Sequence, residues 1–370
     1  MSENFFDYFT KVEIEKFLEF TRNEDETVVL PLLSKESFSL EEVALLLSKG
    51  AVKILENLAV KSAEITFQKF GKTILLYIPL YLSNVCINAC RYCGFSKYKN
   101  GTTLTFEEVK KEADIIYKKG FRHILLVAGE NPSDEFWNLL LNTVEYLRPK
   151  FASVCIEIAP QSEENYRILI EKGVDCITIY QETYHRQTYK YMHPIGPKAD
   201  YKYRLLTPER AAKAGMRKIN LGALLGLYKW KYEFLSMYLH YEFLRKRYWK
   251  VAYSISFPRL KEFGSSFKTP YPVSDLELVH MILVARIVMP EVNLVLSTRE
   301  PANIRDNLIG LGITQMSAES KTEPGGYLYP DRAKKQFEIA DNRSLEEIVS
   351  VIKNKGFDPV FKDWQEVCYG

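Results

Sequence analysis

The sequence contains no long apolar run, since no stretch approaches the roughly 20 consecutive apolar residues of a membrane-spanning helix. It also has no excess of one charge: 50 Lys and Arg residues face 47 Asp and Glu residues, for a net charge of +3. Because the two signs are interspersed, we expect no nucleic-acid partner and no membrane association. The N-terminus lacks the basic and then apolar pattern of a secretory signal, which predicts a cytoplasmic protein.

Cysteine is scarce, with six residues in 370, and no Pro- or Gly-rich tract divides the chain. Three of the cysteines, Cys86, Cys90 and Cys93, fall within eight residues, whereas the other three are scattered. In a reducing compartment, clustered cysteines indicate metal or redox chemistry rather than a disulfide framework.

Short apolar runs rich in β-branched residues recur from Thr73 onwards and alternate with longer amphipathic stretches. The eight runs cover residues 74–80, 123–127, 153–158, 175–180, 218–225, 253–257, 293–296 and 313–317. The helical patterns between them cover residues 105–119, 133–148, 162–172, 207–214, 231–248, 274–288 and 302–310. This alternation implies parallel strands and right-handed crossovers. Eight units predict an α/β fold, a closed (β/α)8 barrel of the TIM type, with an open doubly wound sheet as the alternative.

The chain divides into three predicted segments. Residues 1–70 have helical spacing and form an N-terminal extension, residues 71–324 form the barrel, and residues 325–370 form a C-terminal capping segment. Both outer segments are candidates for covering the barrel mouth. Polar residues or glycines follow each apolar run. Because active sites of such barrels lie at the C-terminal ends of the strands, we expect these residues to share one rim.

The clustered cysteines follow the first predicted strand with the spacing Cys-x3-Cys-x2-Cys. Thiolates are soft ligands that suit zinc or iron–sulfur centres. Structural zinc normally takes four protein ligands, and no nearby fourth Cys or His supplies the last one. Three cysteines on one loop better suit a [4Fe-4S] cluster with one iron left open. The ligands are therefore predicted to be Cys86, Cys90 and Cys93.

This motif, with an aromatic residue before its last cysteine, resembles the signature of the radical S-adenosylmethionine (SAM) enzymes. Further segments resemble the tyrosine lyase family of bacterial thiazole biosynthesis, whose members form 2-iminoacetate. The likeness runs from about residue 60 to Trp364, and it is carried by residues 77–86, 93–96, 125–130, 180–185, 221–227, 254–260, 296–300 and 320–326.

Other members of the superfamily are alternatives. The tyrosine lyase of [FeFe]-hydrogenase maturation (HydG) carries a C-terminal extension with a second cysteine-ligated cluster. This chain ends at Gly370 with only Cys368 there, so we expect one cluster per chain and no carbon monoxide or cyanide. A tryptophan lyase of antibiotic biosynthesis is a more distant relative. A zinc-stabilised barrel that serves only as an interaction module is the non-enzymatic alternative.

The resemblance implies which residues meet SAM. Tyr92 would lie beside the adenine, or it simply packs in the loop. Gly129-Glu130 resembles the Gly-Gly-Glu turn of the superfamily, with Ala128 in place of the first glycine. Glu130 would pair with the SAM ammonium group, or else is a solvated loop acid. Glu157 would accept hydrogen bonds from the ribose, or else is a satisfied buried acid.

Further candidates for SAM binding lie after the fourth and fifth predicted strands. They are Gln181, Glu182, His185, Gly222 and Gly226. A lone histidine such as His185 is more often structural. The two glycines partly match a superfamily pattern that ends in glutamate, but this chain has Lys229 there, so no glutamate contact is carried over.

A tyrosine substrate needs a cation for its carboxylate, and the planar guanidinium is the bidentate choice. Arg299 is the first candidate and Arg259 the second, although an ion pair with Glu300 would make either one structural. Ser297 and Tyr81 are further pocket candidates. We assign no acid or base among the side chains and no group to the phenol.

The resemblance also implies the reaction and its partners. L-tyrosine would be cleaved between Cα and Cβ to 2-iminoacetate and p-cresol, with 5′-deoxyadenosine and methionine as coproducts. A flavodoxin-like external electron donor would reduce the cluster. Because 2-iminoacetate hydrolyses readily, we expect an association with thiazole synthase, which consumes it.

Overall fold

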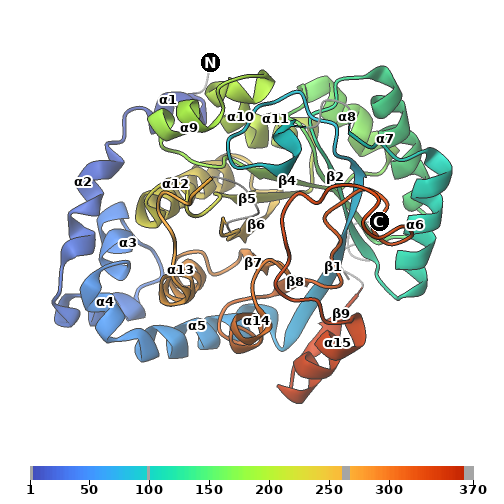
Figure 1. Cartoon of the computed structure of the whole chain (residues 1–370). Coiled ribbons are helices and arrows are strands. Elements are labelled where there is room, and N and C mark those ends of the chain that lie inside the picture. The colour runs from blue at the N-terminus through green and yellow to red at the C-terminus, as the bar shows by residue number, and fades with distance from the viewer. Residues whose placement is uncertain (1–2, 98–100, 261–266, 362–370) are drawn as a thin grey trace.

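The computed structural model describes residues 3–97, 101–260 and 267–361 (Figure 1). Eight parallel strands form its centre. They are β1 (Thr73–Ser83), β2 (His123–Ala128), β3 (Ser153–Glu157), β4 (Cys176–Tyr180), β5 (Lys218–Gly222), β6 (Ala252–Ser256), β7 (Asn293–Leu296) and β8 (Gln315–Ser317). Because β1 pairs with both β2 and β8, the sheet closes into a barrel. The predicted barrel is confirmed, and the open sheet was wrong.

The helices that follow the strands form the outer ring of the barrel (Figure 1). They are α6 (Phe106–Lys118), α7 (Asp134–Leu147), α8 (Glu163–Lys172), α11 (Thr207–Ala214), α12 (Trp230–Arg247), α13 (Asp275–Val288) and α14 (Ala302–Asn307). Each lies where the periodicity predicts a helix. Local signals explain the boundaries: Thr105 and Glu108 form a capping box at the start of α6.

The connection from β4 to α11 is longer than the sequence pattern indicated. It contains α9 (Arg186–Met192), the 3-10 turn η5 (Pro197–Ala199) and α10 (Tyr201–Leu205). These short elements lie beside the cysteine loop, because Ala89 and Arg91 donate backbone hydrogen bonds to Ile195 and Met192, both at 3.1 Å.

The N-terminal segment lies against the outside of the barrel. It comprises α1 (Phe5–Phe9), α2 (Ile14–Leu18), α3 (Leu40–Leu46), α4 (Lys49–Lys53), α5 (Leu55–Phe70) and the 3-10 turns η1 (Phe20–Arg22), η2 (Glu26–Val28) and η3 (Leu30–Ser34). The first three helices pack on α12, and α5 packs on α13. Apolar faces of this segment are therefore buried against the outer helices, and a cover over the barrel mouth by this segment stays a prediction.

The C-terminal segment divides between the two ends of the barrel. Gln336 reaches the mouth, where its side chain accepts a 2.7 Å hydrogen bond from the Tyr81 hydroxyl. Beyond it, α15 (Leu345–Asn354) leads to β9 (Asp358–Val360), which pairs with the first residues of β1 at the opposite end. Only the part before α15 thus covers the mouth. Among the described residues, no helix has the length and apolarity to span a bilayer.

Candidate active site

The three cysteines lie on an irregular loop directly after β1. Cys86 and Cys90 are buried and Cys93 is half-buried, and all three are free thiols. Besides its internal hydrogen bonds, such as Cys93 N–H to the Cys90 carbonyl oxygen at 3.4 Å, the loop is held by neighbouring loops, as Ile87 donates its backbone N–H to Glu130 at 3.1 Å. Hydrogen bonds to the loop after β2 and to the segment after α9 thus determine where the thiols lie.

Two glycines allow these segments to approach the cysteine loop. A Cβ atom on Gly129 would lie 2.4 Å from the Val85 carbonyl oxygen, and one on Gly196 would lie 2.3 Å from Asn88 Oδ1. Gly196 also has a positive φ of 98°, which disfavours any other residue there. Packing of the cysteine loop therefore requires Gly129, one of the predicted site residues.

The thiols fit an iron–sulfur cluster chemically. Burial raises the pKa of Cys90 to about 12 and also raises the pKa of Cys93, while Lys198 opposes both shifts. Buried thiols of this kind ionise when a cationic centre binds them. Among the described residues, no three His, Cys, Asp or Glu side chains converge on a single ion. A four-iron cluster takes each thiolate on a separate iron, so its ligands need no such convergence.

Glu130 and Tyr92 both have partners beside the loop. Asn88 Nδ2 donates to Glu130 Oε2 at 2.6 Å and lies 3.6 Å from Cys86 Sγ. His193 Nδ1 lies 2.8 Å from the Tyr189 carbonyl oxygen and therefore donates to it, which leaves Nε2 to accept from the Tyr92 hydroxyl at 2.8 Å. The sequence analysis did not identify Asn88 and His193 as site residues, because no local motif contains them.

Glu182 is the centre of a buried charge cluster. Lys198 Nζ lies 2.6 Å and Arg204 Nη2 3.2 Å from its Oε1 atom. Burial alone would raise the pKa of Glu182, but the two cations lower it to about 2. The residue also adopts a positive φ of 69°, which is uncommon outside glycine. Both cations come from the unpredicted connection after β4, so the sequence reading missed them.

Glu157 lies inside the barrel at the end of β3. Burial raises its pKa to about 7, the charge of Glu182 adds to this effect, and Arg299 opposes it. Tyr77, Tyr81 and Tyr180 feel the charge of Glu157, and burial raises the pKa of each phenol. The barrel interior therefore places the Glu157 carboxyl group among three phenols whose pKa is raised.

The two candidate arginines have different surroundings. Arg259 forms ion pairs with Glu300 and Asp275, the latter at 2.7 Å, and donates to the Val273 carbonyl oxygen at 3.0 Å. These partners occupy its guanidinium, so the structural alternative holds for Arg259 and its predicted substrate role is not favoured.

Among the described residues, no carboxylate lies within ion-pair distance of Arg299, although the charges of Glu157 and Glu300 act on it. Its guanidinium stacks 3.5 Å from the centre of the Phe337 ring, and its only side-chain hydrogen bond within the described ranges is a long one, 3.5 Å, to the Arg259 carbonyl oxygen. Its Nε atom is buried without a partner, and burial lowers its pKa. A half-buried cation that has no ion-pair partner within the described ranges can bind a carboxylate.

The remaining predicted residues are placed as follows. Gln181 is buried with an unpartnered Nε2 atom, and its backbone N–H donates to Gly222 at 3.0 Å. Gly222 packs against the Tyr180 ring, and Gly226 has a φ of +116°. Ser297 Oγ accepts a 3.4 Å hydrogen bond from the Arg299 backbone.

His185 does not join this site. Its Nδ1 atom caps α9 by accepting from the Thr188 backbone at 3.4 Å, and its ring stacks on Tyr228 at 3.9 Å. These contacts lie away from the cysteine loop's own partners, so the structure gives the residue the structural role that a lone histidine usually has.

Comparison with known proteins agrees with this geometry. Residues 80–237 match the Radical SAM superfamily, and residues 256–358 match the Biotin and Thiamin Synthesis associated domain. The chain is 39% identical to the 2-iminoacetate synthase of Salmonella typhimurium over 90% of this chain and 89% of that protein. The Escherichia coli 2-iminoacetate synthase is 38% identical over the same shares.

A solved structure of HydG, a maturase of the [FeFe]-hydrogenase, superposes with a TM-score of 0.88 at 34% identity and covers 94% of this chain and 79% of that chain. The barrel fold, the cysteine loop and the sequence similarity over nine-tenths of the chain all indicate the same family. The chain belongs to the 2-iminoacetate synthase family of radical SAM enzymes.

Proposed function

We propose that this chain cleaves L-tyrosine between Cα and Cβ into 2-iminoacetate and p-cresol, with SAM consumed to 5′-deoxyadenosine and methionine. The 2-iminoacetate would supply the thiazole moiety of thiamine. Membership of the 2-iminoacetate synthase family supports the reaction. Within the site, Arg299 supports the substrate assignment. Its guanidinium is half-buried and has no carboxylate partner among the described residues.

One [4Fe-4S] cluster would be held by Cys86, Cys90 and Cys93. When bound, the cluster and SAM supply a 5′-deoxyadenosyl radical that takes a hydrogen atom from the substrate. The segment that matches the Biotin and Thiamin Synthesis associated domain, residues 256–358, contains no cysteine. The proposal therefore includes a single cysteine-ligated cluster and excludes the carbon monoxide and cyanide chemistry of the hydrogenase maturation lyase.

The residues around the loop would position SAM. Glu130, oriented by Asn88, offers a carboxylate to the SAM ammonium group. Lys198 and Arg204 together carry one more charge than Glu182 neutralises, so this cluster suits the SAM carboxylate. The other proposed contacts are those of Tyr92, Gly129, Glu157, Gln181, Glu182, Gly222 and Gly226.

The substrate would lie inside the barrel mouth with its carboxylate on Arg299. Ser297 and Tyr81 flank this position, since Ser297 Oγ accepts from the Arg299 backbone and the charge of Arg299 acts on the Tyr81 phenol. The segment around Gln336 and Phe337 covers the same place and would keep water from the reacting atoms.

The proposal includes two protein partners and a compartment. A flavodoxin-like donor would reduce the cluster, and thiazole synthase would receive 2-iminoacetate before water hydrolyses it. A cytoplasmic location would keep the cluster cysteines reduced.

Anaerobic turnover with SAM, a reductant and each amino acid tests the reaction. We expect p-cresol and 5′-deoxyadenosine from tyrosine, measured by chromatography. Formation of 5′-deoxyadenosine without p-cresol would refute the substrate, and indole-derived products from tryptophan would favour the tryptophan lyase. A colourless, zinc-containing protein without iron would support the interaction module instead.

A further inference from the structure

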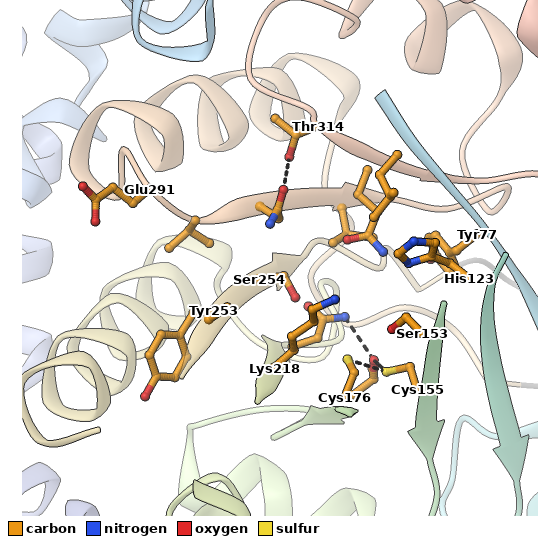
Figure 2. A pocket seen from close by; sticks show the side chains of 18 of the residues that line it. Tyr77, His123, Ser153, Cys155, Cys176, Lys218, Tyr253, Ser254, Glu291 and Thr314 are labelled. Carbon is orange, nitrogen blue, oxygen red and sulfur yellow. Dashed lines mark hydrogen bonds between the residues drawn. The ribbon is translucent and has the colours of Figure 1, made fainter. Parts of the chain in front are cut away.

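A large cavity lies at the end of the barrel opposite the cysteine loop. Its volume is about 820 Å³, and residues at the starts of the strands line it, among them His123, Ser153 and Lys218 (Figure 2). Barrel interiors are commonly filled with branched aliphatic side chains. Here the cavity lining includes the polar side chains of Thr178 and Asn220 beside apolar ones.

Two thiols face each other in the wall of this cavity. Cys155 and Cys176 are paired residues of the neighbouring parallel strands β3 and β4, and their Sγ atoms lie 2.6 Å apart (Figure 2). Adjacent strands lie about 4.8 Å apart, within the Cα separation of roughly 4.4–6.8 Å that a disulfide requires. Both thiols are free and only half-buried. The register of the two strands is therefore compatible with a bond between these thiols.

The surroundings of the pair suit thiol–disulfide exchange. The hydrogen bond with Cys155 and burial raise the pKa of Cys176, so the Cys176 thiol holds its proton. Lys218 stands in register with Cys176 on β5, and Asp175 lies 3.5 Å from its Nζ atom. The charge of Asp175 raises the pKa of Cys176 more than the charge of Lys218 lowers it, which keeps Cys176 protonated. A thiolate beside a thiol, open to a cavity, is the reactant that exchange needs.

We propose that Cys155 and Cys176 form a reversible dithiol–disulfide site that reacts with small disulfides entering the cavity. The Cys155 thiolate attacks one sulfur of a disulfide R–S–S–R and releases R–S⁻, which takes up a proton. Cys176 then loses its proton and attacks the Cys155 sulfur, which releases the second R–SH. The protein dithiol is thereby oxidised to a disulfide while R–S–S–R is reduced to two thiols.

The site is separate from the proposed chemistry of the cluster. The thiols of the cluster loop follow the C-terminal end of β1, whereas the cavity is lined by residues at the N-terminal ends of the strands. The pair also joins two strands that share only two paired positions, Cys155 with Cys176 and Ile156 with Ile177. A disulfide would therefore join β3 and β4 covalently, where the strand pairing is among the shortest in the barrel.

Differential alkylation of the reconstituted holoprotein tests the proposal. The protein is incubated anaerobically with 2-hydroxyethyl disulfide and then with iodoacetamide, and the cysteine peptides are measured by mass spectrometry. We expect both thiols to lose their alkylation and their two peptides to appear joined, lighter by two hydrogens. Dithiothreitol should restore both alkylations, and the iron content should not change.

The Cys155→Ser variant is the matched control, because it keeps a hydroxyl of similar size. In this variant Cys176 should form no internal cross-link. Full alkylation of both cysteines in the treated wild type would overturn the proposal. A mixed disulfide that stays on Cys155, or a cross-link to Cys368, would overturn it as well, because each shows that Cys176 is not the resolving thiol.

Discussion

Replacement of Arg299 by methionine should separate substrate binding from stability. The methionine side chain keeps most of the volume and the contact with Phe337, but it removes the guanidinium. In the free protein this cation has no carboxylate within ion-pair distance among the described residues. Removing an uncompensated charge from a half-buried position should not lower the free energy of unfolding, and can raise it.

The effect on tyrosine use follows from the lost contact. A charge-assisted hydrogen bond to a carboxylate contributes about 1.5–3 kcal/mol, and each 1.4 kcal/mol corresponds to a factor of ten. We therefore expect the KM for tyrosine to rise about 10- to 150-fold in Arg299→Met. The KM for tyrosine of Arg299→Lys should lie between those of the wild type and Arg299→Met, because lysine keeps the charge and loses the bidentate geometry.

The assay combines p-cresol formation at varied tyrosine concentration with thermal unfolding of the same preparations. Arg259→Met is the control. It removes an ion-pair partner of the buried Glu300, so its Tm should fall, whereas the Tm of Arg299→Met should not. An unchanged KM in Arg299→Met, together with a lower Tm, would show that Arg299 is structural and would refute the reasoning.

Three further changes test other parts of the site. Cys90→Ser should lose the cluster and all 5′-deoxyadenosine formation, whereas Cys155→Ser should keep its iron; equal iron contents would contradict the ligand assignment. Glu157 has a folded pKa raised to about 7, so its stabilising contribution is complete below about pH 4.5 and is lost as the pH rises through 7. Between pH 5 and 8 the Tm of the wild type should thus fall more than that of Glu157→Gln, and parallel curves would rule this out. Gly129→Ala places a Cβ 2.4 Å from the Val85 carbonyl oxygen. This overlap should cost roughly 1–3 kcal/mol and reduce iron incorporation, measured as iron per chain, and normal incorporation would disprove the steric argument.

Features that depend on neighbouring residues could be predicted from the sequence. The alternation of apolar runs and amphipathic stretches determines strands and helices locally, and all eight barrel strands were predicted on that ground. The ligand spacing of Cys86, Cys90 and Cys93 lies within one loop, so it too is visible without a fold. The short strand β9 was missed, because its three residues, Asp358–Val360, carry no alternation, and pairing with β1 alone makes them a strand.

Partnerships across the chain were decided only by the tertiary structure. The sequence left both Arg259 and Arg299 as candidates for the substrate carboxylate. Only the packing shows that Glu300 pairs with Arg259 and that Arg299 has no ion-pair partner in the part of the chain that the structure describes. Lys198 and Arg204 form ion pairs with Glu182. They lie in the connection between β4 and α11, where no hydrophobic periodicity predicts the fold of the chain.

Composition, periodicity and ligand spacing by themselves determined the barrel, the cysteine loop and, through resemblance, the family. The register of parallel strands determined the rest, because it pairs residues that lie far apart in the chain. Cys155 and Cys176 are separated by a whole helix, α8, and only the pairing of β3 with β4 places their thiols 2.6 Å apart.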